Sequence, residues 1–138
     1  MTRSEWLVFL QEGTRTAKLA TVHRDGRPHV VPIWFVLDGD DVVFTTGTET
    51  VKARAMRRDP RVCLCVDDER PPYSYVMVEG RVELSDDLEA MLPFATAIGG
   101  RYMGADRAEE FGRRNAVPGE LLVRLVPSRV LAVADVAG

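Results

Sequence analysis

Five basic residues follow a threonine-rich turn in the segment TTGTETVKARAMRRDPRV, which spans residues 45–62. They are Lys52, Arg54, Arg57, Arg58 and Arg61, and they belong to a chain of 138 residues whose formal net charge is −3. Threonine hydroxyls and a glycine that lets backbone approach closely, placed before a helix, are typical of a phosphate site. Because the whole chain is acidic, we expect a local anion site and no binding of nucleic acid.

A helix over residues 51–58 would divide these basic residues between two faces. The solvated arc holds Arg54, Arg57 and Arg58. The apolar side holds Val51, Ala55 and Met56. At about 100° per residue, Lys52 falls among the apolar residues, in the first helical turn. A partly buried lysine there needs a negative partner, which is either an anion from outside the chain or Glu49, three residues earlier.

The hydrophobic pattern predicts a mainly β chain, 1–138, folded as one domain. We expect strands up to about His23, from His29 to Leu37 and from Val42 to Thr46, joined by Asp-Gly turns into an antiparallel meander. Three further apolar segments predict strands: VCLCV (62–66), SYVMVEGRVEL (74–84) and GELLVRLVPSRVLAVADV (119–136). Pro127 in the last of these indicates a bulge, a break or an edge. The pattern favours a small antiparallel barrel with helical additions.

Three helical regions are expected around these strands. Ser4 is predicted to cap the first helix, which ends near Gly13. Thr50 or Thr48 is predicted to cap the basic helix. Residues 86–115 have a helical pattern, and Pro93 within it predicts a kink or the start of a new helix.

Other residues that could do chemistry have simpler interpretations. His23, His29, Cys63 and Cys65 lack the spacing of a metal site, and the two cysteines suit buried thiols better than a mutual disulfide. Tyr73, Tyr75 and Tyr102 could protonate a substrate, but packing is the commoner role. Arg101 and the segment EEFGRRN (109–115) either attract an acidic group or form a solvated helix face. No signal peptide or membrane span is expected, which favours a cytoplasmic protein.

Residues 18–68 (KLATVHRDGRPHVVPIWFVLDGDDVVFTTGTETVKARAMRRDPRVCLCVDD) and 73–84 (YSYVMVEGRVEL) together carry a family resemblance. They resemble the flavin- and deazaflavin-binding proteins of the pyridoxamine 5′-phosphate oxidase superfamily, and most of all the actinobacterial branch that uses coenzyme F-420. The resemblance implies an FMN-binding-like antiparallel split β-barrel with flanking helices. It also implies a homodimer whose cofactor lies in a groove between two subunits. The apolar runs in VCLCV and YVMVEG suit strands buried on both faces, as in such a dimer.

The resemblance also implies which residues contact the cofactor. The phosphate contacts would be Thr45, Thr46, Lys52 and Arg54. The backbone of Val31, Pro32, Ile33 and Trp34 would run beside the ring system. The helical wheel agrees for Lys52 but places Arg54 on the solvated face. Pro32 cannot complete a regular ladder, so its strand is expected at an edge with backbone free for a ligand.

Two departures from the FMN-using oxidases favour a deazaflavin. Val51 stands where those enzymes carry an arginine before the lysine, and the chain ends VLAVADVAG without their arginine-bearing segment. The expected function is a coenzyme F-420-dependent oxidoreductase that transfers a hydride to an unsaturated organic acceptor, a small molecule, with no catalytic side chain assigned. The alternatives are an FMN-dependent reductase or oxidase of the same fold and a carrier that binds the cofactor without turnover.

Overall fold

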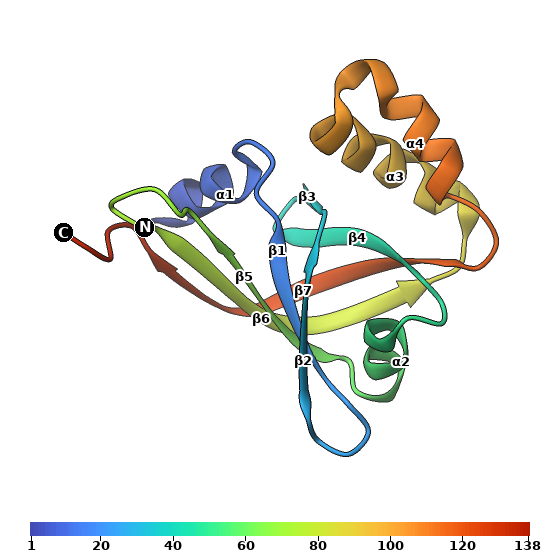
Figure 1. Ribbon diagram of the computed structural model, residues 1–138, viewed down its shortest axis with the longest axis horizontal. Coiled ribbons are helices and arrows are strands. Elements are labelled where there is room, and N and C mark those ends of the chain that lie inside the picture. Colours follow the sequence, from blue (N-terminus) through green and yellow to red (C-terminus); the bar gives the residue numbers. More distant parts are fainter.

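The computed structural model describes residues 1–138 as seven strands, four α-helices and one 3-10 turn (Figure 1). The helices are α1 (Arg3–Gln11), α2 (Val51–Arg58), α3 (Leu88–Met103) and α4 (Ala108–Asn115), with the turn η1 (Ala105–Arg107) between the last two. The strands are β1 (Ala17–Val22), β2 (Pro28–Ile33), β3 (Val36–Asp38), β4 (Asp41–Gly47), β5 (Arg61–Asp67), β6 (Tyr75–Ser85) and β7 (Glu120–Val133). None of the helices is both long and apolar enough to cross a membrane.

All seven strands belong to one antiparallel sheet with the order β2-β1-β5-β6-β7-β4-β3. The expected meander is wrong, because the segment from His29 to Leu37 is two strands that lie at opposite ends of this order. The chain breaks at Trp34 and Phe35, and the Phe35 side chain is fully buried. One continuous apolar run therefore supplies two edges of the sheet and a core residue between them.

Caps and turns set the helix boundaries. Thr2, not Ser4, caps α1, because its Oγ1 accepts a hydrogen bond from the N–H of Glu5 (3.2 Å) while Glu5 accepts one from the N–H of Thr2 (3.0 Å). Helix α3 continues through Pro93, so the second of the two alternatives, a new helix starting there, is wrong, and the next helical turn follows Gly104. Gly104 has a φ of 107°, a conformation that few residues other than glycine adopt.

A bulge in β7 confirms the prediction made from Pro127. Gly80 of β6 faces Pro127, whereas the preceding Glu79 faces Arg129, so Ser128 is left without a partner. A Cβ atom on Gly80 would overlap the carbonyl oxygen of Val126, so only glycine fits this close approach of the two strands.

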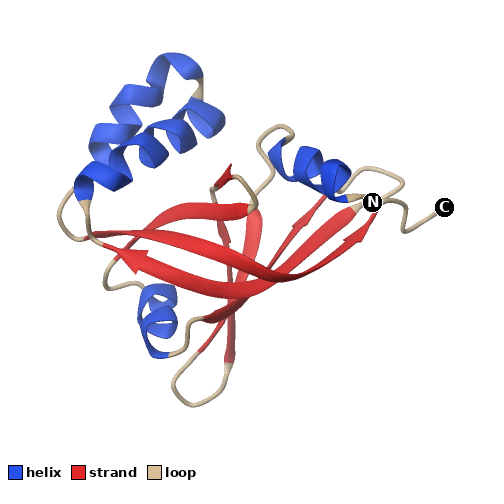
Figure 2. Cartoon of the chain, turned by 180° about the vertical axis from the view of Figure 1, so that it is seen from behind, coloured by secondary structure: helices blue, strands red, loops and turns tan.

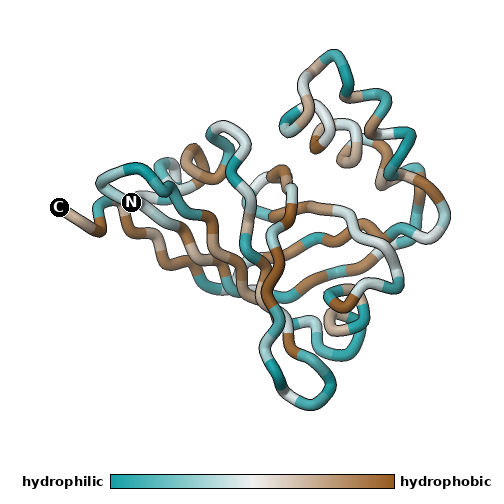
Figure 3. Tube along the Cα trace, in the orientation of Figure 1, coloured by the Kyte–Doolittle hydropathy of each residue, from teal (hydrophilic) through white to brown (hydrophobic).

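The main core fills the inside of the curved sheet and is closed at one end by α1, while the α3–α4 pair stands away from the sheet at the other end (Figures 1 and 2). A smaller cluster of Val43, Met91 and Leu122 attaches α3 to the sheet. Hydrophobic residues occur along most of the strands (Figure 3), and the pairing registers place some of them on the outer face of the sheet, away from the main core. On this outer face Val30 is 63% exposed, and Val22 and Leu131 are each 46% exposed.

Candidate functional site

Two threonines and a glycine build the turn before α2. Thr50 caps the helix, as one of the two predictions had it: its Oγ1 accepts a hydrogen bond from the N–H of Ala53 (3.2 Å) and donates one to the carbonyl of Gly47 (3.1 Å). Thr46 is only 5% exposed, and its hydroxyl lies 2.9 Å from that of Thr50. Because the Thr50 hydroxyl donates its proton to the Gly47 carbonyl, the Thr46 hydroxyl is the donor in its hydrogen bond with Thr50. Thr45 is half-buried and points to the opposite face of β4.

The first N–H groups of α2 are free. Ala53 is the first residue of the helix whose N–H is bound, and the N–H groups of Val51 and Lys52 make no hydrogen bond with the chain. Such groups, at the positive end of the helix dipole, are where a helix holds an anion.

Lys52 is half-buried beside these groups and makes neither an ion pair nor a hydrogen bond. Burial lowers the pKa of its ammonium group. The alternative partner, Glu49, is taken by Arg54, whose Nη2 lies 3.2 Å from Glu49 Oε2. The helical wheel placed Val51 on the apolar side of α2, and this prediction is wrong. Val51 is 44% exposed, because no other element covers the first residue of α2.

Lys52 shares its side of α2 with Ala55 and Met56, which are buried together with Ala53. The predicted solvated arc is confirmed, since Arg54, Arg57 and Arg58 are all exposed. Arg58 donates a hydrogen bond to the carbonyl of Val22 (3.0 Å) and so ties the end of α2 to β1. Lys52 is thus the one cation of α2 that is both half-buried and without a partner.

Sequence reasoning missed Glu120, the acidic neighbour of Lys52. Glu120 begins β7 and faces Gly47 across the β4–β7 ladder. Its Oε2 is buried without a hydrogen-bond partner, and it would lie 3.8 Å from a Cβ built on Gly47. Burial raises the pKa of the Glu120 carboxyl, and the nearby charge of Lys52 opposes that shift. The only signal in the sequence was an acidic residue at the start of an apolar strand. Its proximity to α2 depends on the register of β4 and β7, which the sequence does not show.

Strand β2, which carries three of the four predicted ring contacts, forms an edge of the sheet with β1 as its only neighbour. This confirms the edge expected from Pro32. Pro32 is exposed and faces Lys18, Val31 is half-buried, and Ile33 is buried. The outer backbone edge of β2 is therefore free for a ligand.

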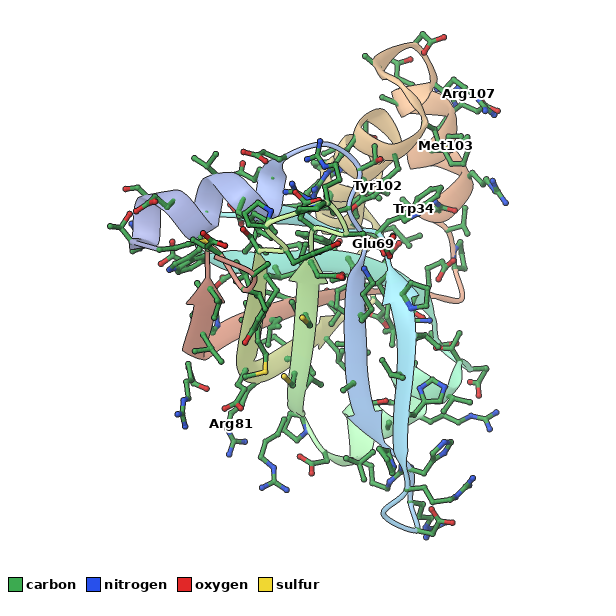
Figure 4. The ribbon with its side chains drawn as sticks, turned by 60° about the vertical axis from the view of Figure 1, so that its left-hand side comes forward. Trp34, Glu69, Arg81, Tyr102, Met103 and Arg107 are labelled. Carbon is green, nitrogen blue, oxygen red and sulfur yellow. The ribbon has the colours of Figure 1, made fainter.

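Trp34, the fourth predicted ring contact, follows β2 and is 40% exposed. Its indole stacks on Tyr102 of α3, with the ring centroids 5.0 Å apart and the planes 2° from parallel (Figure 4). The ring of Phe111 in α4 meets it edge-on at 6.4 Å. The helix pair therefore holds Trp34 in place at the end of β2.

The hydroxyl of Tyr102 is committed to backbone. It donates a hydrogen bond to the carbonyl of Arg15 (2.8 Å) and accepts one from the N–H of Phe35 (3.3 Å). Burial is the main cause of the raised pKa of this hydroxyl. These contacts favour packing over proton donation as the role of Tyr102.

Arg101 neither lies on a solvated face nor presents a free charge. It is half-buried, and its guanidinium donates to the carbonyls of Gly13 (2.9 Å), Phe35 (2.7 Å) and Leu10 (2.8 Å). Both expectations for Arg101 are wrong, because a helical pattern does not show that α3 lies against the end of α1 and the break between β2 and β3.

The predicted phosphate contacts and ring contacts lie in separate parts of the chain's fold. In the strand order β2 is the first strand and β4 the last but one, and no hydrogen bond joins the two groups. Helix α2 packs against β1, the neighbour of β2. A ligand that used both groups of one chain would have to pass along α2 and β1.

A polar groove of about 590 Å³ lies between the segment before β1 and the β5–β6 loop. Ion pairs cross it, from Arg15 to Asp68 (3.1 Å) and from Lys18 to Asp67 (2.8 Å). Because Lys18 faces Pro32 in the β1–β2 ladder, the groove adjoins the free edge of the sheet.

No group of three histidine, cysteine, aspartate or glutamate side chains that could hold a metal ion occurs in the structure. His23 and His29 pack edge to face with their centroids 5.2 Å apart. Cys63 and Cys65 are free, half-buried thiols, and burial raises the pKa of both.

A seven-stranded antiparallel sheet with this connectivity and these helices is a split β-barrel, mainly β with helical additions, as the sequence predicted. A family model described as pyridoxamine 5′-phosphate oxidase matches residues 4–134. The chain therefore belongs to the pyridoxamine 5′-phosphate oxidase family.

Individual proteins agree with the family. A pyridoxine/pyridoxamine 5′-phosphate oxidase of Myxococcus xanthus (strain DK1622) is 39% identical over 88 residues, which are 63% of this chain and 42% of that protein. The match thus spans less than half of the relative. The crystal structure of the conserved hypothetical protein Rv2991 from Mycobacterium tuberculosis superimposes with a TM-score of 0.85 and 27% identity, over 96% of this chain and 84% of that one. The structure of an F-420 reductase superimposes with a TM-score of 0.70 and 29% identity, over 89% of this chain and 94% of that one.

Proposed function

We propose that this protein is a coenzyme F-420-dependent oxidoreductase acting on an unsaturated organic small molecule. The observation that carries the proposal is Lys52, a half-buried cation without a partner beside the free N–H groups at the start of α2. An anion at this point would satisfy the ammonium and the N–H groups together. The chain's own residues thus fit the phosphate of such a cofactor.

Each predicted phosphate contact has a separate role in this proposal. Lys52 is the principal cation for the phosphate, and Thr45 supplies a hydroxyl. Thr46 supports the phosphate contact through Thr50, with which it shares a hydrogen bond. Arg54 takes part only by leaving Glu49, with which it pairs in the structure.

The ring system lies along the free edge of β2 in this proposal. The backbone of Val31, Pro32 and Ile33 borders it, and Trp34 closes its end with an indole held by Tyr102. The bound deazaflavin supplies the hydride in the reaction. The protein contributes orientation and a partly dry surface, and no side chain is assigned as an acid or base.

The choice of deazaflavin over FMN is supported by the similarity to an F-420 reductase and by Val51 before Lys52. A second candidate is an FMN-dependent reductase or oxidase, which the similarity to the Myxococcus oxidase favours. A third is a carrier that binds either cofactor without turnover. We also retain the cytoplasmic location as a prediction.

Titration of the purified protein with coenzyme F-420 and, separately, with FMN tests the choice. The proposal expects tighter binding of coenzyme F-420, followed by oxidation of the reduced cofactor when an unsaturated acceptor is added. Tight FMN binding with no affinity for coenzyme F-420 would support the second candidate. Binding without turnover across a panel of acceptors would support the carrier.

We further propose that the protein is a homodimer with the cofactor site at the subunit interface. The outer face of the sheet carries the exposed Val22, Val30 and Leu131, and Cys63 and Met77 beside them are half-buried. A second copy placed on this face would cover them. It would also bring the β2 edge of one chain toward the α2 region of the other chain. Within a single chain these two regions are separate. Sedimentation of a stable monomer at micromolar concentration would contradict this.

A further inference from the structure

Three buried side-chain atoms lack a hydrogen-bond partner, and one of them belongs to an ionisable acid. They are Thr21 Oγ1, His29 Nδ1 and Glu120 Oε2. Thr21 and His29 face each other across β1 and β2, where one buried water molecule could satisfy both. Glu120 is different, because its unsatisfied atom is an acceptor of a carboxyl group next to the proposed phosphate site. A buried acceptor without a donor is costly, so its presence there needs a reason.

The surroundings of Glu120 contain a single opposing charge. From α2 it is faced by Lys52, which is the only charged group that acts on its carboxyl. From β4 it is faced by Gly47, and the methyl of Thr50 lies against the same glycine. On the far side of β7, β6 ends at Ser85, and the nearby carboxylate of Asp87 is used to cap α3.

Lys52 and Glu120 are close enough to affect each other yet form no ion pair. The charge of each opposes the effect of burial on the other. An ammonium drawn into a direct pair with Glu120 would have its donors occupied. A carboxylate at longer range favours the charged form of the lysine while its donors stay free.

Resting on the proposed function, we propose that Glu120 competes with the cofactor phosphate for the charge of Lys52. The phosphate must approach both Lys52 and a carboxylate of its own sign. Protonation of Glu120 removes this repulsion. Binding of the phosphate therefore strengthens as the pH falls through the pKa of Glu120, and the substitution Glu120→Gln makes the strong binding permanent.

The test measures equilibrium binding of coenzyme F-420 between about pH 5 and 9, where its phosphodiester keeps a constant charge. We expect Glu120→Gln to bind about five- to tenfold more tightly than wild type at neutral pH, the effect of one like charge near a partly exposed site. We expect the wild-type dissociation constant to fall toward that of the variant at low pH, while the variant stays nearly constant. Glu83→Gln removes an exposed carboxylate of β6 and is the matched control for net charge, with little change expected.

A second measurement does not depend on the substitution at Glu120. NMR titration of the Glu120 side-chain carboxyl in the free protein should give a pKa above that of an exposed glutamate, and Lys52→Met should raise it further. Equal or weaker binding by Glu120→Gln, with the pH profile of wild type, would overturn the role of Glu120 and leave the proposed function standing. Failure of wild type to bind coenzyme F-420 or FMN at any pH would remove the proposed function and this inference with it.

Discussion

Arg101 and Lys52 are both half-buried cations, but only Arg101 has hydrogen-bond partners in the chain. Burial lowers the pKa of both Arg101 and Lys52. Arg101 donates to three backbone carbonyls and also lies over the ring of Phe35, with its guanidinium carbon 4.6 Å from the ring centroid. Lys52 donates to nothing in the chain.

The contrast separates a cation that serves the fold from one that is available to a ligand. A satisfied buried cation stabilises the segments that it joins, and its loss leaves several acceptors without donors. An unsatisfied one weakens the free protein slightly and gains its partner only on binding. Substitution at Arg101 should therefore change stability, and substitution at Lys52 should change affinity.

The largest expected effect is that of Arg101→Ala on stability. The change removes charge-assisted hydrogen bonds to Leu10 and Gly13 at the end of α1 and to Phe35 at the break between β2 and β3. We expect a loss of about 3 kcal/mol in the free energy of unfolding and a fall of about 10 °C in Tm, measured by urea and thermal unfolding. A lysine at this position can bond only some of these carbonyls, so the free energy of unfolding of Arg101→Lys should lie between those of wild type and Arg101→Ala. An unchanged Tm in Arg101→Ala would show that the helix pair does not depend on this contact.

Tyr102→Phe should have a smaller effect of the same kind. It removes the hydroxyl that joins the backbone of Arg15 and Phe35 but keeps the ring that stacks on Trp34. We expect a loss of about 1 to 2 kcal/mol in the free energy of unfolding and an unchanged affinity for the cofactor. Loss of turnover without loss of stability would instead identify Tyr102 as a proton donor.

Trp34 should report binding at the β2 edge by fluorescence. Cofactor titration is expected to quench tryptophan emission, and Trp34→Phe should remove most of that quenching. The chain's other tryptophan, Trp6 in α1, supplies the remaining signal. Quenching that survives Trp34→Phe intact would place the ring system elsewhere.

The smallest effect is expected at the solvated arc of α2. Arg57 is exposed and makes no ion pair, so Arg57→Ala should weaken cofactor binding by no more than about twofold, and added salt should abolish the difference. The loss of cofactor affinity in Arg54→Ala is expected to lie between the losses for Arg57→Ala and for the substitution at Lys52. Arg54 can reach the phosphate only by leaving its ion pair with Glu49. Equal losses for all the basic residues would mean that general attraction, rather than one positioned lysine, binds the anion.

Local patterns in the sequence predicted most of the elements of this fold. The Asp-Gly turns, the Thr50 cap, the Pro32 edge and the Pro127 bulge each depend on the conformation of a few neighbouring residues, and the structure contains all four. The exposed arc of α2 and the half-burial of Lys52 followed from helical periodicity in the same way.

Features that depend on distant segments were missed. The break at Trp34 was hidden within a continuous apolar run, because only the rest of the sheet decides that its two halves lie at opposite ends. The contacts of Arg101 require α3 to bring this side chain to the end of α1, and the position of Glu120 beside Lys52 requires the β4–β7 register. In each case the partner lies far away in the sequence.

The most direct test of the account is to compare Lys52→Ala with Arg57→Ala in two measurements on the same samples, the affinity for coenzyme F-420 and the free energy of unfolding. We predict that Lys52→Ala weakens binding about ten- to a hundredfold, which corresponds to one charge-assisted contact of about 1.5 to 3 kcal/mol, and changes the free energy of unfolding only slightly. Arg57→Ala should change neither quantity appreciably. Wild-type affinity in Lys52→Ala, together with a loss in Arg57→Ala, would contradict the central claim that the unpartnered lysine is the anion-binding group.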